Sequence, residues 1–456
     1  MKGVSLHQKT KRYEIVRLKN YYPEQFGLFI MALKNLQESD DWARICGIHG
    51  NTFKPDDPCV LCPTDPNVVK VISETGEPFY CKHSVYSFIG WHTPYIYQFE
   101  LLLNKYNRSS IKDYISLPYL DLTDFSNDYS FLNDTKIAIL YNNKKILVDN
   151  PLAYSYYYVN GIKTKTTRNG FFTPTTPNEK MQLDTIKKQL NNTLYASSYE
   201  HFSSSINLLT DYIPLETPHN NLHDIIGGVG GNMSDISISA FDPVFWLHHC
   251  NMDRHFYTWL YLNTNHFKIP LYPSKIMKEN YEATQAPFFN SNIYSTDFNN
   301  YKYGWENKEI KYMLLKDTLH VDNFPYTYDI IKPQPEQPMQ SYVELIDIPV
   351  PRESVTISVY MYKKTETLDR EKHFAGSTFW FGINRNKTYC HRCEVIRTNM
   401  IIDIDEYVNQ NEITSLNISE YNYMIEGEGK LINSSNGYAT YSQDELLKDG
   451  LIDLII

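Results

Sequence analysis

The stretch that decides the fold is AFDPVFWLHHCNMDR, at residues 240–254. It contains a strong helix start, because the Asp242 carboxylate can accept free amide hydrogens of a first turn and Pro243 fits the first helical position. The apolar turn that follows carries His248 and His249 toward a protein core. Adjacent residues point about 100° apart on a helix, so only one of these histidines can readily face a shared metal ion. The other is expected to pack in the core.

A second pair of histidines lies upstream, in ETPHNNLH at residues 216–223. His219 and His223 are four residues apart, so on a helix they share one face and can bind one metal ion. Alone, this spacing is weak evidence, because it recurs on ordinary helix surfaces. Asp253, four residues after His249, could accept a ring N–H or pair with a cation.

Three more histidines lie earlier in the chain. They are His49, His83 two residues after Cys81, and His92 just before the Thr-Pro pair at 93–94. That pair is predicted to start a helix, which places His92 at the helix entrance. Two sets of three histidines, with few carboxylates near them in sequence, favour copper or zinc over magnesium or calcium, which prefer oxygen ligands.

The composition indicates a folded protein and argues against a nucleic-acid-binding or membrane protein. The 456 residues are 42% hydrophobic and 21% charged, which suits a folded chain of two or three domains. The net charge of -10 argues against electrostatically driven binding to nucleic acid or an anionic membrane. No apolar run reaches the roughly 18 residues of a membrane span. The first residues lack the apolar segment of a secretory signal, and seven cysteines are an odd number, so we expect a cytoplasmic protein.

A domain boundary is predicted at the proline-rich segment 331–340, IKPQPEQPMQ, because its prolines disfavour both helix and central strand. Residues 1–330 show apolar spacing typical of helices. Residues 341–456 contain alternating runs, such as 355–362, and are predicted to form a smaller β-rich domain.

Together these motifs resemble the type-3 binuclear copper family of tyrosinases, catechol oxidases and molluscan haemocyanins, and are most like fungal tyrosinases. The likeness rests on the block at 240–254, on its wider region 215–259, and on the earlier histidine group in the right order. It implies a mainly α catalytic domain built on a four-helix bundle around a binuclear copper site. A sandwich-like β-rich C-terminal domain would follow and shield that site.

The resemblance assigns six histidines to two copper ions. Those of the first copper would be His49, His83 and His92. Those of the second would be His219, His223 and His249, with His248 a non-ligand. Cys81 would be joined to the His83 ring by a thioether.

With O2 as co-substrate, such a site would convert small monophenols to o-diphenols and then to o-quinones, the entry to melanin-type pigments. Glu216 and Asn220 would help take the proton from the incoming phenol; the alternative for Glu216 is a helix N-terminal charge. A catechol oxidase or an o-aminophenol oxidase without monophenolase activity is the alternative function, and an oxygen carrier is the third. No nucleic-acid or membrane partner is expected, and whether the chain forms a homo-oligomer stays open.

Two features beyond the histidines belong to the same resemblance. Tyr326 and Tyr328 match the tyrosine motif that closes the catalytic domain, where one of them would bond to an N-terminal arginine, for which Arg12 is the candidate. Thr93 stands where the family commonly has arginine, which puts an ion pair in doubt.

The CxxC pair Cys390 and Cys393 resembles one that is implicated in copper loading of some fungal tyrosinases, so we hypothesise that it delivers copper. A four-thiolate zinc site with the CxxC pair at 59–62 is disfavoured, because the likeness puts the pairs in different domains. Nearby Tyr389 is a candidate to plug the phenol pocket of a latent enzyme, which cleavage within 331–340 would activate.

Overall fold

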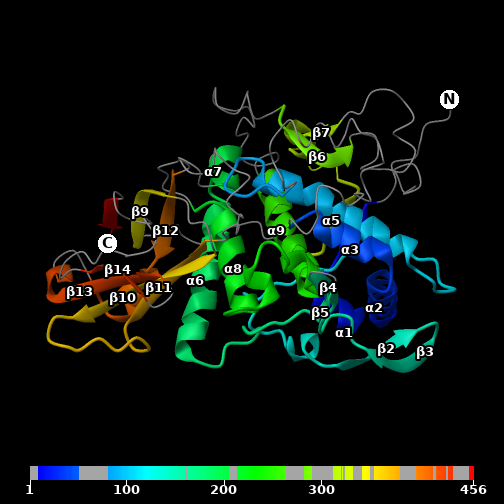
Figure 1. The fold of residues 1–456 in the computed structure, drawn as a ribbon, viewed down its shortest axis with the longest axis horizontal. Coiled ribbons are helices and arrows are strands. Elements are labelled where there is room, and N and C mark those ends of the chain that lie inside the picture. The colour runs from blue at the N-terminus through cyan, green and yellow to red at the C-terminus, as the bar shows by residue number, and fades with distance from the viewer. Residues whose placement is uncertain are drawn as a thin grey trace. The chain divides into compact units, whose positions relative to one another are not determined.

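The structure is a computed structural model of the chain (Figure 1). The residues that it describes are 9–50, 81–159, 162–196, 198–204, 213–262, 282–289, 312–319, 321, 324–331, 341–349, 354–380, 397–413, 417–427, 430–434 and 451–455.

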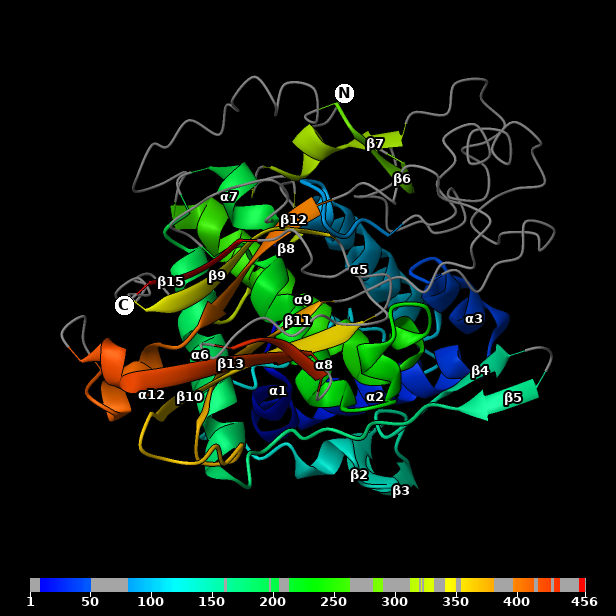
Figure 2. The same ribbon diagram turned by 60° about the vertical axis from the view of Figure 1, so that its left-hand side comes forward.

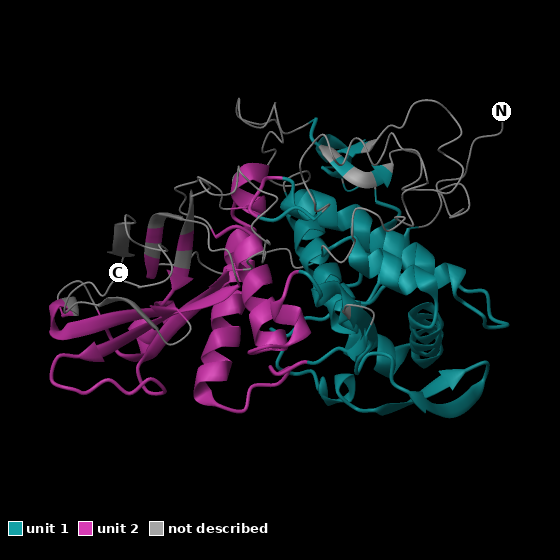
Figure 3. Ribbon diagram, in the orientation of Figure 1, with its two compact units in different colours: residues 1–83, 87–167, 237–333 teal, residues 84–86, 168–236, 334–456 magenta. Residues whose placement is uncertain are grey.

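The chain divides into two compact units (Figure 3). The first comprises residues 1–83, 87–167 and 237–333, and the second comprises residues 84–86, 168–236 and 334–456. Residues 168–236, which precede the predicted domain boundary, therefore cluster with the C-terminal strands. The boundary itself stays a prediction, because residues 332–340 lie outside the described part of the chain.

The first unit is mainly helical. Its helices are α1 (Ile15–Tyr21), α2 (Pro23–Gln37), α3 (Asp40–Gly47), α5 (Phe88–Lys105) and α9 (Pro243–Leu262). Short 3-10 turns follow at Ser130–Leu132, Ser239–Phe241 and Leu315–Thr318. The paired strands are β1 (Thr10–Arg12) with β8 (Tyr326–Tyr328), β2 (Lys136–Tyr141) with β3 (Lys144–Asp149), β4 (Tyr156–Val159) with β5 (Ile162–Lys165), and β6 (Thr284–Phe289) with β7 (Tyr312–Leu314).

Helices α5 and α9 form the centre of this unit. Every residue of α9 except Tyr261 is buried, which is the pattern of a core helix. The rings of Phe99 and Trp246 stack between the two helices, with centroids 3.8 Å apart. The predicted start of α9 is confirmed: Pro243 is its first residue, and the amide of Val244 donates to the Asp242 carboxylate at 2.9 Å.

The predicted helix start at the Thr-Pro pair 93–94 is wrong. Helix α5 begins at Phe88, so His92 and Pro94 both lie inside it. Burial explains the longer helix, because Phe88, Ile89 and Trp91 are all fully buried within it, and the burial of apolar side chains is stabilising. This gain offsets the hydrogen bond that Pro94 cannot donate.

The second unit combines helices with two antiparallel sheets. Its helices are α6 (Pro177–Thr193), α7 (Tyr199–Ser203), α8 (Glu216–Gly227) and α12 (Asp405–Gln410), with 3-10 turns at Asn232–Ser234 and Ile418–Glu420. Its strands are β9 (Tyr342–Pro349), β10 (Val355–Lys363), β11 (Phe374–Trp380), β12 (Arg397–Asp403), β13 (Tyr421–Gly427), β14 (Lys430–Ser434) and β15 (Leu451–Ile455).

These strands form a sheet in the order β11-β10-β13-β14 and a second in the order β12-β9-β15; Figure 2 shows β10, β11 and β13 side by side. The predicted strand at 355–362 is confirmed as β10, where Ile357, Val359 and Met361 are buried and alternate with less buried residues. None of the helices in the described ranges has the length and apolar character needed to cross a membrane.

A buried ionic network closes the first unit around Arg12. Strands β1 and β8 run parallel, with Arg12 opposite Tyr328. The guanidinium donates to Glu100 Oε2 at 2.8 Å and to Asp253 Oδ2 at 3.2 Å, and it lies over the Tyr326 ring, 3.4 Å from its centroid. Arg12 also donates to the Tyr328 hydroxyl at 3.0 Å. The predicted contact between this arginine and the tyrosine motif is confirmed for both tyrosines.

Replacing Arg12 with methionine should lower the free energy of unfolding by about 3–5 kcal/mol, because it leaves the carboxylates of Glu100 and Asp253 buried without their cation. The measurement is urea unfolding near neutral pH. The control is Lys136→Ala, which breaks an exposed ion pair with Asp149 and should leave the unfolding midpoint unchanged. Equal midpoints for Arg12→Met and wild type would contradict the expectation.

Candidate metal centre

The first histidine group lies within the first unit. His49 follows α3, Cys81 and His83 precede α5, and His92 lies on α5. One potential ligand atom from each of these four residues lies within 4.8 Å of the others. The centroids of the three histidine rings are 5.3–5.6 Å apart. The structure therefore brings together the three histidines predicted for one metal ion.

Hydrogen bonding fixes which nitrogen of His92 could bind a metal. Nδ1 lies 2.7 Å from the Phe88 carbonyl oxygen, which can only accept, so Nδ1 carries the hydrogen. The lone pair is then on Nε2. Burial lowers the pKa of His92 to about 3, against the opposing effect of the Phe88 hydrogen bond. A neutral imidazole with a backbone carbonyl behind it is the usual state of a histidine metal ligand.

Cys81 lies among these imidazoles. Its Sγ is 3.2 Å from Nδ1 of His83 and 3.5 Å from Nε2 of His92. The side chain is buried. The predicted proximity of Cys81 and His83 is therefore present.

Helix α8 of the second unit carries the upstream histidine pair. His219 and His223 are fully buried, and their ring centroids lie 4.6 Å apart. Nδ1 of His219 donates to Asn220 Oδ1 at 2.8 Å, and Nδ1 of His223 donates to the Met233 carbonyl at 2.7 Å. Both histidines thus keep Nε2 for a metal, as His92 does.

A glycine pair makes the His223 contact possible. Gly228 ends α8 with a φ of 60°, a conformation that other residues rarely adopt. At Gly227, a Cβ atom would lie 2.2 Å from the Ser234 Oγ. The chain can therefore turn back tightly enough to bring the Met233 carbonyl to His223.

Glu216, the first residue of α8, is buried and held by two donors. Oε1 accepts from the Ser84 amide at 2.7 Å, and Oε2 accepts from the Ser204 hydroxyl at 2.5 Å. Burial raises the pKa of Glu216 to about 7, although both hydrogen bonds oppose this shift. Near neutral pH the carboxyl can therefore both accept and release a proton.

The histidine pair on α9 belongs to the first unit. Both rings are buried, and their planes are 73° apart. The His249 ring stacks on His92 at a centroid distance of 4.6 Å and packs on Phe245 at 4.0 Å. His249 is thus the member of the pair that lies against the first histidine group. The roles assigned to His248 and His249 stay predictions.

Sequence reasoning missed the groups that support these histidines and Glu216. They are the carbonyls of Phe88 and Met233 and the donors Ser84 and Ser204. Backbone carbonyls carry no residue signature. The glycine pair at the end of α8 was the one local signal that the chain turns back toward His223.

The low pKa of His92 predicts acid sensitivity of the metal-free protein. Folded His92 stays neutral down to about pH 3, whereas the unfolded residue binds a proton near pH 6.5. Stability is therefore full above pH 6.5 and is lost as pH falls through this window. Between pH 7 and 5, the free energy of unfolding of His92→Gln should fall by about 2 kcal/mol less than that of the wild type, measured with urea. An equal fall in both proteins would refute this.

Comparison with known proteins points to one family. A profile of the common central domain of tyrosinase matches residues 39–262. A tyrosinase from Neurospora crassa is 31% identical over 317 residues, which cover 57% of this chain and 44% of that protein. Hemocyanin 1 from Megathura crenulata is 26% identical over 239 residues, covering 51% of this chain and 6% of that protein. The chain thus spans less than half the length of either relative.

The fold has a solved counterpart. The structure of a recombinant mushroom tyrosinase superimposes with a TM-score of 0.68 at 18% identity, covering 93% of this chain and 91% of the other. The resemblance therefore extends over both units, and at this identity it concerns the fold.

Proposed function

Because the chain belongs to the tyrosinase family of type-3 copper proteins, we propose that it is an enzyme that oxidises small phenols with O2 at a pair of copper ions. The observation that supports this most directly is the first histidine group, in which three imidazoles and Cys81 lie within 4.8 Å of one another. Such a donor set favours copper or zinc over magnesium and calcium, which prefer oxygen ligands, and the family favours copper.

Six histidines would hold the metal. The proposed ligands of the first copper are His49, His83 and His92, and those of the second are His219, His223 and His249. In this proposal four helices surround the two ions. The buried imidazoles fit copper, since those with assigned hydrogen bonds keep Nε2 for a metal. When bound, the copper pair supplies O2 activation and electron transfer.

The chain's own groups would orient the ligands and handle protons. Asn220 holds the His219 ring through its hydrogen bond to Nδ1. Cys81 is close enough to His83 for the proposed thioether, which would fix that ring covalently. Glu216, held by Ser84 and Ser204, would accept the hydroxyl proton of an incoming monophenol.

The reaction proposed is that of a tyrosinase: a monophenol and O2 give an o-quinone and water, through the o-diphenol, on the way to melanin-type pigments. Glu216 favours the monophenol step, because a buried carboxyl with a pKa of about 7 can take a proton at neutral pH. A diphenol or o-aminophenol oxidase would use the same metal pair without that step. The similarity to a haemocyanin keeps oxygen carriage as a distinct outcome.

Other parts of the proposal concern residues outside the described ranges. Cys390 and Cys393 as copper donors and Tyr389 as the plug of a latent enzyme fall there, as does the pair at 59–62. Shielding of the site by residues 341–456, cleavage within 331–340 and a cytoplasmic location likewise stay predictions.

The two neighbouring histidines of α9 offer a matched test of the metal site. Copper-loaded wild type should hold two coppers per chain and darken both L-tyrosine and L-dopa. His249→Gln should lose one copper and both activities, whereas His248→Gln should keep two coppers. Copper is measured by atomic absorption and quinone formation by absorbance. A diphenol oxidase darkens only L-dopa, a carrier darkens neither, and zinc alone in loaded protein would overturn the proposal.

Glu216→Gln should lower kcat for monophenols by a factor of about 10²–10⁴, because the variant has no carboxylate to take the phenol proton. The wild-type rate should rise with pH around 7, and the variant should lose this rise. Oxidation of diphenols should change less.

Stability provides the control for Glu216→Gln. The folded carboxyl has a pKa raised from 4.5 to about 7, so its ionisation costs stability as pH rises through this window, in total about 3 kcal/mol. Above pH 7 the glutamine variant should therefore be at least as stable as wild type. A monophenol rate with an unchanged pH profile in this variant would exclude Glu216 as the base.

A further inference from the structure

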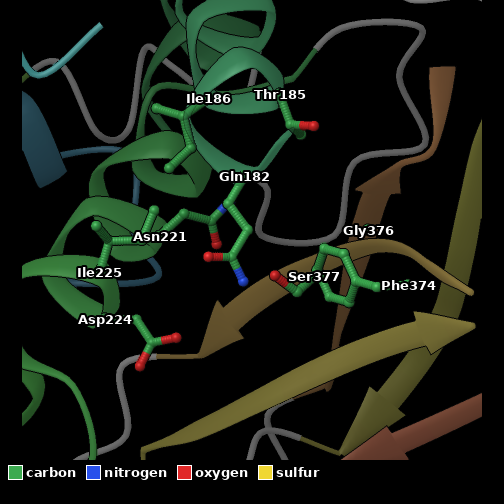
Figure 4. Close-up of a pocket in the computed structure, with 9 residues that line it drawn as sticks. All are labelled: Gln182, Thr185, Ile186, Asn221, Asp224, Ile225, Phe374, Gly376 and Ser377. Carbon is green, nitrogen blue, oxygen red and sulfur yellow. The ribbon is translucent and has the colours of Figure 1, made fainter. Parts of the chain in front are cut away.

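Helix α8 has a second face that the proposed chemistry does not use. Glu216, His219, Asn220 and His223 follow the i, i+3, i+4, i+7 spacing of one helix face. Asn221, Asp224 and Ile225 lie on other sides of the helix. All three lie at the contact between α8 and the C-terminal strand β11 (Figure 4).

Asn221 bonds on both sides of this contact. Its Oδ1 accepts from the backbone amide of Phe379 in β11 at 2.7 Å. Its Nδ2 donates to Oε1 of Gln189 in α6 at 3.0 Å. Asn221 is 6% exposed and Gln189 is fully buried, so water cannot readily replace these bonds. One side chain thus joins α8 to a helix and to a strand.

Two further contacts hold the same side of α8. The Thr356 hydroxyl of β10 donates to Asp224 Oδ2 at 2.9 Å. The Phe379 side chain packs in a buried contact with Ile236, in the segment that follows α8. The C-terminal strands therefore hold α8 through its side chains and also pack on the chain beyond it.

Packing alone does not join α8 to β11. A small pocket opens along their contact, lined by Gln182, Thr185 and Asp224 from the helices and by Phe374 and Ser377 from β11 (Figure 4). Close-packed interfaces lose alignment only at high cost, but an interface with a gap depends more on its specific bonds. The Asn221 bond to the Phe379 amide is a specific bond of this kind.

We propose that Asn221 is a positioning residue: by bonding β11 to the back of α8, it fixes the helix that presents His219 and His223. The strands at 355–380 then form part of the support of the metal ligands. We call the two hydrogen bonds of Asn221, to Phe379 and to Gln189, the clamp on α8. The role of this clamp in metal binding rests on the proposed function, whereas its role in holding α8 does not.

The hydrogen bond between the Phe379 amide and Asn221 can be tested by replacing its acceptor. Without the Asn221 oxygen, the Phe379 amide loses this buried hydrogen bond, and the loss of one such bond is enough to change an opening equilibrium about tenfold. The lost hydrogen bond belongs to the contact between α8 and β11, so α8 should unfold locally more often. Aspartate at position 221 would keep an oxygen for the Phe379 amide, and the Gln189 side chain could turn its NH2 toward it.

The test compares three full-length variants with wild type. Asn221→Leu removes the acceptor, Asn221→Asp keeps it, and Tyr407→Phe removes a different buried hydrogen bond, that from Tyr407 to the Met361 carbonyl. The first readout is hydrogen exchange of residues 216–227 in metal-free protein. The second is the rate at which copper leaves the loaded protein to a chelator.

In Asn221→Leu, the amides of α8 should exchange about tenfold faster than in wild type, and one of two coppers should leave about tenfold faster. Tyr407→Phe should behave as wild type in both readouts. Asn221→Asp should fall between wild type and Asn221→Leu, because it keeps the acceptor but buries a carboxyl group. Unchanged α8 exchange in Asn221→Leu, or equal acceleration in Tyr407→Phe, would overturn the clamp. Faster α8 exchange with unchanged copper release would overturn the positioning role. If wild type binds no copper, the proposed function fails. The hydrogen-exchange data then still test whether Asn221 holds α8 against β11.

Discussion

The first unit depends on one buried carboxylate, that of Asp253. It accepts hydrogen bonds from Thr93 at 2.6 Å, Tyr326 at 2.8 Å and Tyr328 at 2.5 Å, and it pairs with Arg12 at 3.2 Å. An isolated charge at this depth would be costly, and burial indeed raises its pKa against these partners. The compensating groups come from α5, β1 and β8, so the charge can be satisfied only when these elements meet α9. Thr93 follows His92 directly, and Asp253 lies one turn after His249. The same bond that satisfies the charge therefore sets the spacing of the helices that carry these two stacked rings.

This network explains how the chain accommodates threonine where the resemblance led us to expect arginine. The Thr93 hydroxyl donates to Asp253 Oδ1 directly, at 2.6 Å. The cation beside Asp253 and Glu100 is Arg12, on a strand that pairs in parallel with the tyrosine motif. Glu100 also accepts the Leu117 amide at 2.8 Å, so both carboxylates remain fully engaged.

The features that the sequence predicted correctly are those with local or paired signals. The Asp-Pro helix start of α9 and the alternation of β10 follow from capping chemistry and spacing. The gathering of His49, His83 and His92 was implied by the family resemblance of the paired motifs. The start of α5 was misplaced because a proline signal outweighed the burial of Phe88 and its neighbours, which only tertiary packing reveals. Hydrogen-bond partners such as the Met233 carbonyl were out of reach, since any residue type can supply a backbone oxygen. The grouping of residues 168–236 with C-terminal strands likewise depends on contacts between distant segments.

The two units fix the orientation of their histidine rings in different ways. A metal-binding imidazole must be neutral and must present one defined nitrogen, so the other nitrogen needs an acceptor that cannot move. For His92 that acceptor is a carbonyl of its own helix, and the helix is fixed by the charges around Asp253. For His223 the acceptor lies beyond the end of α8, at Met233, so the helix itself must be held in place from outside. In the second unit, neutral bonds to α6 and β11 through Asn221 perform this role. The orientation of the second histidine pair therefore depends on strands more than a hundred residues further along the chain.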